Sequence, residues 1–351
     1  MFLFKKKKDV VGIDIGSSSV KLVQLKDVKG SYQLLSVGIL PLPPEAIVDN
    51  SLMDSAAIVA AVKNLAASLG VKSIDAACSI SGNSVIIRKI LLPAMPAEEL
   101  EDQIVWEAEQ YIPFDINDVN MDFQIMSPDI VDPSKMNVLL VASKKDIIND
   151  YVSVFSEAGM NLGVVDIDSF AVQNAYEMNY DVNPDDVLAL INIGASVMNI
   201  NIVKEGLTLF TRDVQMGGNL YTEEIQKQMG VSSDDAESMK LLAHETNNAA
   251  LLDVLAKVNE TITQEIRRSL DFYNSTANDD RITKIYVCGG CSKVYGLVGA
   301  ISEKLSLPVD LLNPFNRLKY NEKEFDPEYL QEIGPLMAVT VGLAIRRVGD
   351  K

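Results

Sequence analysis

Near the start of the chain, an acidic residue, a glycine–serine turn and a lysine follow one another closely. The segment 10–25 reads VVGIDIGSSSVKLVQL and places Asp14 in an apolar run, a turn at 16–19 and Lys21 in a returning run. Two apolar runs about a short turn predict a β-hairpin. Glycine lets a backbone approach phosphate, serine hydroxyls and turn N–H groups donate to its oxygens, and aspartate can hold hydrated Mg²⁺. The pattern fits a phosphate-binding hairpin, and it fits a core hairpin with an incidental acid equally well.

The same pattern occurs again at the start of the second half of the chain. The letters INIG at 191–194 match IDIG at 13–16, an offset of 178 (192 minus 14) in 351 residues. Two similar halves that each open with such a hairpin predict a nucleotide held between two lobes. The sequence contains no GxxxxGK[ST] loop and no GxGxxG after a predicted strand, which argues against the P-loop and Rossmann classes.

Composition and charge indicate a globular protein with more than one core. Hydrophobic residues make up 48% and charged residues 23% of the chain, and the formal net charge is −18. A chain of this length exceeds one ordinary core, so we expect at least two lobes. Binding to a nucleic-acid backbone needs a basic face, so nucleic acid is not expected as a partner.

The first eight residues, MFLFKKKK, depart from this acidic balance. Only short apolar sequence precedes Lys5 to Lys8, so no secretory signal is predicted, and no apolar run approaches the ~20 residues of a membrane span. We therefore expect a cytoplasmic protein. The apolar residues and lysines could contact an anionic membrane surface weakly, or they could form a solvated terminus.

The cysteines and the single histidine limit the classes of enzyme. Cys288 and Cys291 form a CxxC around two glycines, and Cys78 lies far from them in sequence. With His244 as the only histidine and no second CxxC, a four-ligand zinc site would need every cysteine and histidine of the chain, and their spacing does not match a zinc motif. The same scarcity of histidine argues against Ser-His-Asp and Cys-His catalysis. We expect no functional thiol chemistry.

The periodicity of the first half predicts the elements that must position these residues. Strands are expected at 10–15, 20–25, 32–40, 74–80 and 85–92, the last two about a turn, with a helix at 56–69. A boundary near Ala97 precedes an insertion of α-β-β-α-β order, with elements at 98–110, 121–126, 138–142, 145–158 and 162–167. We expect Trp106 to pack in the core of this insertion. The aromatic segment 106–114 is expected near the lobe boundary.

The second half predicts a further mixture of strands and helices. A helix at 168–180 leads into the second hairpin, and a strand follows at 207–214. Patterns at 221–229, 233–242 and 251–273 predict a largely helical block. A strand at 282–287 ends at Gly289 and Gly290, and helices are expected at 294–304 and 335–347.

Together these motifs resemble the two phosphate loops and the adenosine motif of the actin, hexokinase and Hsp70 superfamily. The letters GGN at 217–219 followed by AESMK at 236–240 resemble the cell-division homologue FtsA. The start of the chain, VWEAEQYIPF at 105–114 and IGPLMAVTVGLAIR at 333–346 resemble the PilM family of type IV pilus assembly proteins. This last resemblance covers the whole chain.

The resemblance implies an α/β, actin-like (ribonuclease-H-like) two-lobed fold. Its duplicated mixed-sheet domains would carry an inserted subdomain of the FtsA type. The expected division is a lobe 1 core at 1–97, 165–185 and 335–351, the inserted subdomain at 98–164, a lobe 2 core at 186–214 and 282–334, and a helical or mixed subdomain at 215–281.

The resemblance also implies a binding site for ATP or ADP with Mg²⁺. Carried onto this sequence, Asp14 would organise Mg²⁺ and Lys21 would be the phosphate lysine. The other residues implied for nucleotide binding are Gly16, Ser17 and Ser18 in the first phosphate loop, Asn192, Gly194, Ala195 and Ser196 in the second, Gly218, Glu237 and Lys240 near ribose and adenine, and Gly289, Gly290, Ser292 and Lys293 along the adenosine.

Two departures from the superfamily pattern predict slow or absent hydrolysis. Asn192 stands where many hydrolytic relatives carry aspartate. The position of actin's water-orienting glutamine falls near Phe170, and Gln173 follows almost a turn later. We therefore expect ATP to act as a structural or switching ligand, and we assign no catalytic residue.

In the PilM family, the inserted subdomain and the first lobe form a groove for the short cytoplasmic N-terminal peptide of the membrane protein PilN. The resemblance implies an ATP-binding component of the pilus inner-membrane platform, at the inner face of the membrane, that binds PilN and contacts other platform and motor proteins. Its membrane contact would be indirect, or weak through Lys5 to Lys8. The alternatives are an FtsA-like cell-division protein and a working ATPase or kinase. A kinase needs a carboxylate base, and the sequence offers only Asp14 for this role.

Overall fold

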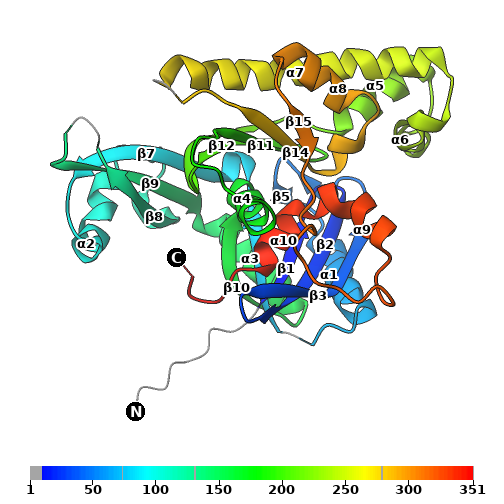
Figure 1. Ribbon diagram of the computed structural model, residues 1–351. Coiled ribbons are helices and arrows are strands. Elements are labelled where there is room, and N and C mark those ends of the chain that lie inside the picture. Colours follow the sequence, from blue (N-terminus) through cyan, green and yellow to red (C-terminus); the bar gives the residue numbers. More distant parts are fainter. Residues whose placement is uncertain (1–9, 73, 130–131, 278–279, 351) are drawn as a thin grey trace.

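Figure 1 shows the computed structural model, which describes residues 10–72, 74–129, 132–277 and 280–350. Within these residues the strands form two five-stranded sheets, a three-stranded sheet and a ribbon of β4 (Ile47–Val48) and β5 (Ser51–Leu52). Among the same residues, no helix is both long and apolar enough to cross a membrane. The predicted membrane contact of Lys5 to Lys8 lies outside the described residues.

The first sheet, which we call lobe 1 together with the helices on it, has the strand order β10-β6-β1-β2-β3. Its strands are β1 (Val11–Ile15), β2 (Ser19–Val28), β3 (Ser31–Pro41), β6 (Asp75–Ile80) and β10 (Asn161–Ile167). Helices α1 (Ser55–Ser68) and α3 (Lys145–Glu157) pack on it. The Asp54 side chain caps the N-terminus of α1, and the apolar stripe of α1, including Ile58 and Val62, meets Ile13 of β1 in the core.

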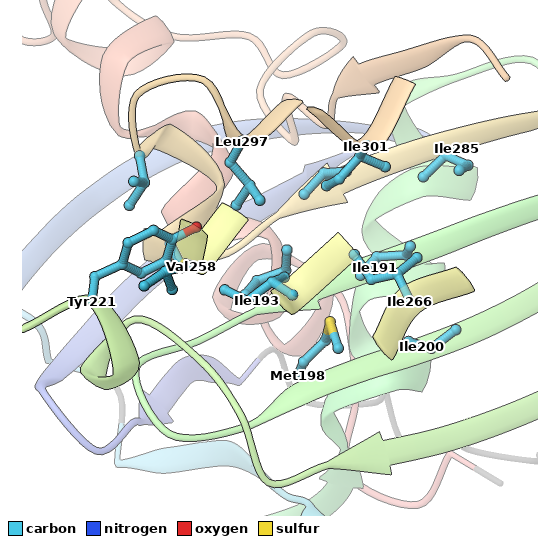
Figure 2. Close-up of a cluster of buried hydrophobic side chains, with 14 of the residues drawn as sticks. Ile191, Ile193, Met198, Ile200, Tyr221, Val258, Ile266, Ile285, Leu297 and Ile301 are labelled. Carbon is cyan, nitrogen blue, oxygen red and sulfur yellow. The ribbon is translucent and has the colours of Figure 1, made fainter. Parts of the chain in front are cut away.

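The second sheet, which we call lobe 2 together with its helices, has the order β15-β14-β11-β12-β13. Strand for strand, this order corresponds to β10-β6-β1-β2-β3 of lobe 1. Its strands are β11 (Leu188–Ile193), β12 (Met198–Lys204), β13 (Leu207–Val214), β14 (Lys284–Cys288) and β15 (Val309–Leu311). Its helices are α5 (Asn219–Met229), α6 (Ser233–Leu241), α7 (Ala249–Thr276) and α8 (Leu297–Leu305). Figure 2 shows the core, where Ile191 and Ile200 of the sheet meet Tyr221 and Ile266 of the helices.

The two sheets repeat each other in direction and in register. In each sheet, the first strand pairs antiparallel with the second and parallel with the strand on its other side. Asp14 pairs with Lys21 in lobe 1, and Asn192 pairs with Asn199 in lobe 2. Both members of the second pair lie 178 residues after their counterparts (192 minus 14 and 199 minus 21). The duplication predicted from the sequence is confirmed.

Helices α4 (Asp168–Asn179) and α10 (Ala338–Ala344) lie between the two sheets (Figure 1). They cross closely, because a Cβ atom on Gly342 would lie 1.8 Å from the Ala171 carbonyl oxygen. A Cβ atom on Gly12 of β1 would lie 2.4 Å from the Thr340 carbonyl oxygen. Glycine at both positions therefore lets α10 pack directly on β1 and on α4.

A third sheet, which we call the inserted sheet, follows β6 and has the order β7-β9-β8. Its strands are β7 (Val85–Pro93), β8 (Val119–Pro128) and β9 (Lys135–Lys144), and α2 (Ala97–Ala108) packs on it. Alternate residues of β7 serve different cores. Ile90 and Leu92 pack under α2 with Leu100, whereas Val85 and Ile87 pack against the core of lobe 1.

The elements of this region belong to different sheets. The strands at 74–80 and 85–92 lie about a turn, as predicted, but they do not pair with each other, because β6 joins lobe 1 and β7 pairs with β9. The inserted sheet has β-α-β-β order, since α3 and β10 pack in lobe 1. The divisions proposed at Ala97 and 164 therefore do not follow the sheets. Local periodicity identifies strands, but it does not show which distant strand each one pairs with.

Trp106 is also placed differently from the expectation. It is 77% exposed on α2, while the buried face of this helix carries Leu100, Ile104 and Ala108. Residue 106 lies two positions from both Ile104 and Ala108, and such a spacing places it on the opposite side of a helix. The short elements β4, β5, β15 and α9 (Pro327–Ile333) were not predicted from the sequence.

Candidate functional site

The turns of both hairpins line one cavity of about 290 Å³ between the lobes. The predicted nucleotide-binding residues that line it are Asp14, Gly16, Ser17, Ser18, Lys21, Asn192, Gly194, Ala195, Gly218, Glu237, Lys240, Gly289 and Gly290. The cavity also has polar lining residues that the sequence analysis did not single out, among them Ser79, Asp168, Asn199 and Asn219. Segments from both halves of the chain thus converge on one site.

In lobe 1, the hairpin presents a charged pair to the cavity. Lys21 Nζ lies 2.8 Å from Asp14 Oδ2, and each side chain is 13% exposed. The two residues are cross-strand partners, so the pairing of β1 with β2 sets this distance. The Gly16 N–H donates to the Ser19 carbonyl oxygen at 3.0 Å and closes the turn beside them. The hairpin therefore combines a carboxylate suited to a metal ion with an ammonium suited to phosphate.

In lobe 2, the corresponding pair carries no charge. Asn192 Nδ2 donates to Asn199 Oδ1 at 2.8 Å, and Asn199 Nδ2 donates to Asp213 Oδ1 at 2.8 Å. The Gly194 N–H donates to the Val197 carbonyl oxygen at 2.9 Å, the equivalent of the turn bond in lobe 1. Burial raises the pKa of Asp213 above its usual value. Lobe 2 thus keeps the backbone turn and replaces the ion pair by amides.

Asp168 brings a second carboxyl group into the cavity, and the sequence analysis did not propose it. It is the first residue of α4, directly after β10, and its Oδ1 accepts a hydrogen bond from Ser79 Oγ at 2.5 Å. Burial and the nearby Asp14 raise the pKa of Asp168 to about 6. Two carboxyl groups facing one cavity form a donor set for a hydrated divalent cation. The view that only Asp14 offers a carboxylate is therefore wrong.

The sequence did contain a signal for Asp168. An aspartate that directly follows a predicted buried strand lies at the end of a sheet, where functional groups gather in α/β folds. The same residue also begins a predicted helix, where an acidic side chain is favourable to the helix dipole, so its position has a second explanation. The strand pairing that brings Asp168 beside Asp14, through β6, links distant segments.

On the side of lobe 2, helices α5 and α6 present a polar cluster. Lys240 Nζ lies 2.6 Å from Glu237 Oε2 and also donates to the Gly218 carbonyl oxygen at 3.3 Å. Thr222 Oγ1 donates to the same carboxylate oxygen at 2.7 Å. Lys240 is buried, whereas Glu237 is nearly half exposed. The two residues share one face of α6, as their spacing predicts, and the carboxylate is the more accessible of the two.

The glycine turn after β14 approaches the second hairpin closely. Gly289 has φ of +85°, and a Cβ atom there would lie 2.4 Å from the Ile193 carbonyl oxygen and 2.6 Å from Asn192 Oδ1. Only glycine fits this contact without a shift of the backbone. A Cβ atom on Gly290 would meet nothing within 4 Å, so its backbone lies open to the cavity.

Three of the predicted binding residues do not line the cavity. Ser196 Oγ accepts a hydrogen bond from Asn219 Nδ2 at 3.2 Å, and Asn219 is a lining residue. Ser292 is buried, and its Oγ donates to the Gly289 carbonyl oxygen at 2.7 Å. Lys293 forms an ion pair with a glutamate of α9 at 3.3 Å. Ser196 and Ser292 therefore support lining residues, while Lys293 is engaged elsewhere.

Gln173 also lies away from the cavity. Its Nε2 donates to Glu177 Oε1 and to the Gly206 carbonyl oxygen, both at 2.8 Å. Its Oε1 accepts hydrogen bonds from Asn201 and Thr208. Phe170 packs against the core of lobe 1. Gln173 is thus fixed by its own hydrogen bonds and is not placed to orient a water molecule in the cavity.

The three cysteines are buried in the protein interior. Burial raises the pKa of the Cys78 and Cys288 thiols well above their usual value, and it raises the pKa of Cys291 to about 12. The thiolate is the nucleophilic form, so burial disfavours reaction at these thiols. The CxxC segment frames the Gly289 turn.

Two sheets of one topology, each with a hairpin turn facing a shared cavity, define a protein of the actin-like, two-lobed class. The chain matches the family model of the type IV pilus assembly protein PilM over residues 12–348, and it belongs to this family. The resemblance and the fold class predicted from the sequence are confirmed.

Known proteins similar to the chain include a solved PilM structure and more distant relatives of the same fold. The solved structure of a PilM-PilN type IV pilus biogenesis complex has a TM-score of 0.88 and 28% identity, over 97% of this chain and 99% of that one. The cell division protein FtsA of Bacillus subtilis (strain 168) is 22% identical over 97% of this chain and 86% of its own length. The ethanolamine utilization protein EutJ from Carboxydothermus hydrogenoformans shares the fold, with a TM-score of 0.60 and 15% identity over 97% and 90% of the two chains.

Proposed function

We propose that this PilM-family chain is a cytoplasmic adaptor at the inner face of the inner membrane, which binds Mg-ATP between its lobes and the N-terminal peptide of PilN beside its inserted sheet. The similar PilM-PilN complex supports PilN as the partner. The nucleotide part rests on one observation, the convergence of Asp14, Lys21 and Asp168 with the glycine turns of both lobes in one cavity. Contacts with other platform proteins and with the pilus motor would follow from this position.

The lining of the cavity suits a triphosphate with hydrated Mg²⁺. Lys21 and the turn N–H groups near Gly16 and Gly194 would bind phosphate oxygens. Asp14 and Asp168 would hold water molecules of the metal ion. The bound Mg²⁺ would supply positive charge between the carboxylates and the phosphate oxygens, so it would also lower the pKa of Asp168.

The nucleoside would lie on the side of lobe 2. The accessible carboxylate of Glu237 is a hydrogen-bond acceptor suited to ribose hydroxyls. The open backbone at Gly290 leaves room for a flat base. Lys240 is buried under Glu237, so its proposed role is to hold that carboxylate in place.

We expect the bound ATP to act as a structural or switching ligand. Asn192 places an amide where many hydrolytic relatives carry a second carboxylate that organises the metal ion. Gln173 does not reach the cavity, because its side chain donates a hydrogen bond to the Gly206 carbonyl oxygen. Binding depends on charge and on backbone donors, which the cavity retains. Rapid hydrolysis needs an oriented and activated water molecule. The carboxylates that line the cavity, Asp14, Asp168 and Glu237, are already assigned to the metal ion and the ribose.

The surface proposed for PilN follows from the two faces of the inserted sheet. One face is covered by α2, on which Trp106 is exposed, while Phe114 at the end of segment 106–114 lies under Lys144, the residue before α3 of lobe 1. On the other face, Ile87 packs against lobe 1 and Leu91, four positions along the same side of β7, is 44% exposed. An extended peptide with apolar side chains would fit between this face and lobe 1.

Titration of the PilN N-terminal peptide into the full chain tests this surface. Leu91→Glu should weaken binding about tenfold or more, because it puts a charge into the apolar contact. Val105→Glu is the matched control, since Val105 is 40% exposed on α2, across the sheet, and its exchange should leave the affinity unchanged.

Deletion of residues 1–8 should also leave peptide binding intact, because the basic terminus is not part of the proposed surface. Equal weakening by Leu91→Glu and Val105→Glu would show that the peptide binds elsewhere on the inserted sheet. Loss of binding with the deletion would place it at the N-terminus.

A further inference from the structure

The loop that enters the inserted sheet is held from both lobes. This loop, residues 81–84, connects the end of β6 in lobe 1 to the start of β7. The Gly82 N–H donates a hydrogen bond to Asp213 Oδ2 at the end of β13 in lobe 2. From lobe 1, Asn50 Nδ2 donates to the Ser81 carbonyl oxygen at 2.9 Å. Three parts of the molecule therefore meet at Gly82.

Gly82 itself is closely packed within this loop. Gly82 is buried and has φ of +69°. A Cβ atom on it would lie 1.9 Å from Asn50 Nδ2 and 3.0 Å from Gln215 Nε2. A change in the position of lobe 2 relative to lobe 1 would therefore act directly on this backbone.

The same loop is bonded to groups that line the nucleotide cavity. On lobe 2, Asn192 donates to Asn199 and Asn199 donates to Asp213, each at 2.8 Å, and both asparagines line the cavity. On lobe 1, Asn50 and Ser81 are lining residues themselves. Asp213 thus links the second hairpin to the loop at the start of β7. One of its carboxylate oxygens accepts a hydrogen bond from Asn199, and the other accepts a hydrogen bond from Gly82.

We propose that Asp213 is a positioning residue that couples the nucleotide cavity to the inserted sheet, so that Mg-ATP and the partner peptide bind cooperatively. The proposal rests on the proposed function and adds its regulation. A ligand that bridges both hairpins fixes lobe 2 against lobe 1, and Asp213 transmits this position to the loop at the start of β7. The peptide surface on β7 is then ordered before the peptide arrives, which lowers the cost of peptide binding.

The coupling is measured as the ratio of the Mg-ATP dissociation constants without and with saturating PilN peptide. We expect a ratio of about five or more for the unaltered chain, with tighter binding when the peptide is present. The peptide must gain the same factor from Mg-ATP, because coupling between two equilibria is reciprocal. A merely structural role of Asp213 would change both affinities without changing this ratio.

Asp213→Asn should bring the ratio close to one. The exchange keeps the size of the side chain but leaves one acceptor oxygen for two donors, so either Asn199 or Gly82 loses its bond. The double exchange Asn199→Asp with Asp213→Asn should restore the ratio. In this double variant, the carboxylate at position 199 would accept hydrogen bonds from the Asn192 side chain and from the side-chain N–H₂ at position 213. The side-chain oxygen at position 213 would then accept the hydrogen bond from the Gly82 N–H.

Two further variants keep the test decisive. Gln215→Ala is the matched control, because Gln215 is exposed and approaches Gly82 without being a member of the Asn199–Asp213–Gly82 hydrogen bonds, so the ratio should stay as in the unaltered chain. Asn199→Ala interrupts the path at its middle and should lower the ratio even if Asp213→Asn does not fold. Hydrogen exchange at the Gly82 amide should slow with Mg-ATP in the unaltered chain and respond less in Asp213→Asn.

A ratio of one in the unaltered chain, with both ligands bound, would overturn the coupling while leaving the proposed function intact. An unaltered ratio in Asp213→Asn would show that the path does not pass through this residue. Absence of both binding events would overturn the proposed function, and the coupling would fall with it.

Discussion

The two hairpins have the same backbone register but differ in charge at the same two positions. Asp14 and Lys21 form an ion pair at 2.8 Å in lobe 1, whereas Asn192 and Asn199 form an amide pair at 2.8 Å in lobe 2. Both turns keep the N–H bond that shapes a phosphate loop. The duplication has therefore kept the geometry in both halves and placed the charge in one. In the proposed function lobe 1 holds the phosphate and the metal ion, and in the proposed coupling lobe 2 senses their presence through Asp213.

The largest expected effect comes from giving the first hairpin the residues of the second. Asp14→Asn combined with Lys21→Asn should lower the affinity for Mg-ATP about a hundredfold or more, because charge-assisted contacts contribute about 1.5–3 kcal/mol each. The fold should survive, since Asn192 and Asn199 form this pair at the same register. Calorimetry measures the affinity, and circular dichroism measures the fold.

An ion pair outside the cavity provides the control for this exchange. Lys204 and Asp280 lie 2.6 Å apart in lobe 2, and neither lines the cavity. Replacing both by asparagine should leave the affinity for Mg-ATP unchanged. Equal affinity in the unaltered chain and in the doubly exchanged first hairpin would show that the charge difference between the hairpins has no role in binding.

The next effect concerns the second carboxyl group that lobe 1 brings to the cavity. The pKa of Asp168 is raised from 3.8 to about 6, so the folded chain binds this proton more tightly than the unfolded chain does. Its contribution to the free energy of unfolding is fully present below pH 3.8 and is lost as the pH rises through about 6. Asp168→Asn should therefore stabilise the ligand-free chain at pH 7.5, by about 2 kcal/mol after allowing for partial exposure.

Thermal melts of the unaltered chain and Asp168→Asn between pH 4.5 and 7.5 measure this difference. The two melting temperatures should diverge as the pH rises, and added Mg-ATP should stabilise the unaltered chain more than the variant. A constant difference over this pH range would show that Asp168 is ionised in the folded chain throughout.

The smallest expected effect comes from adding a carboxylate to the second hairpin. The unaltered chain should hydrolyse ATP at less than about one turnover per second, at the bottom of the usual enzyme range. Asn192→Asp should raise this rate only a few-fold, because Gln173 still lies outside the cavity. A phosphate-release assay measures both rates. A rate above about one turnover per second in the unaltered chain, measured without any partner, would show that the Asn192 amide does not limit hydrolysis.

The parts of the site that lie close together in sequence were predictable. Each hairpin is formed by neighbouring residues, so the apolar runs about Gly16 and Gly194 were sufficient to predict it. The glycine pair at 289–290 and the spacing of Glu237 and Lys240 were equally local. All of these residues line the cavity.

The parts that depend on distant pairing were not predictable from one sequence. Asp168 reaches the cavity because β10 pairs with β6 and β6 with β1, and β7 leaves lobe 1 because it pairs with β9. Neither pairing has a local signature. The position of Trp106 was predicted wrongly for a different reason. Its helix is amphipathic, and a single apolar residue can lie on the exposed side of such a helix.

Titration of Mg-ATP into the unaltered full chain, beside Lys21→Ala, tests the central claim most directly. We predict saturable binding at one site, weakened about tenfold or more by the loss of the Lys21 ammonium. No binding to the unaltered chain, or the same affinity in Lys21→Ala, would contradict the assignment of this cavity to a nucleotide.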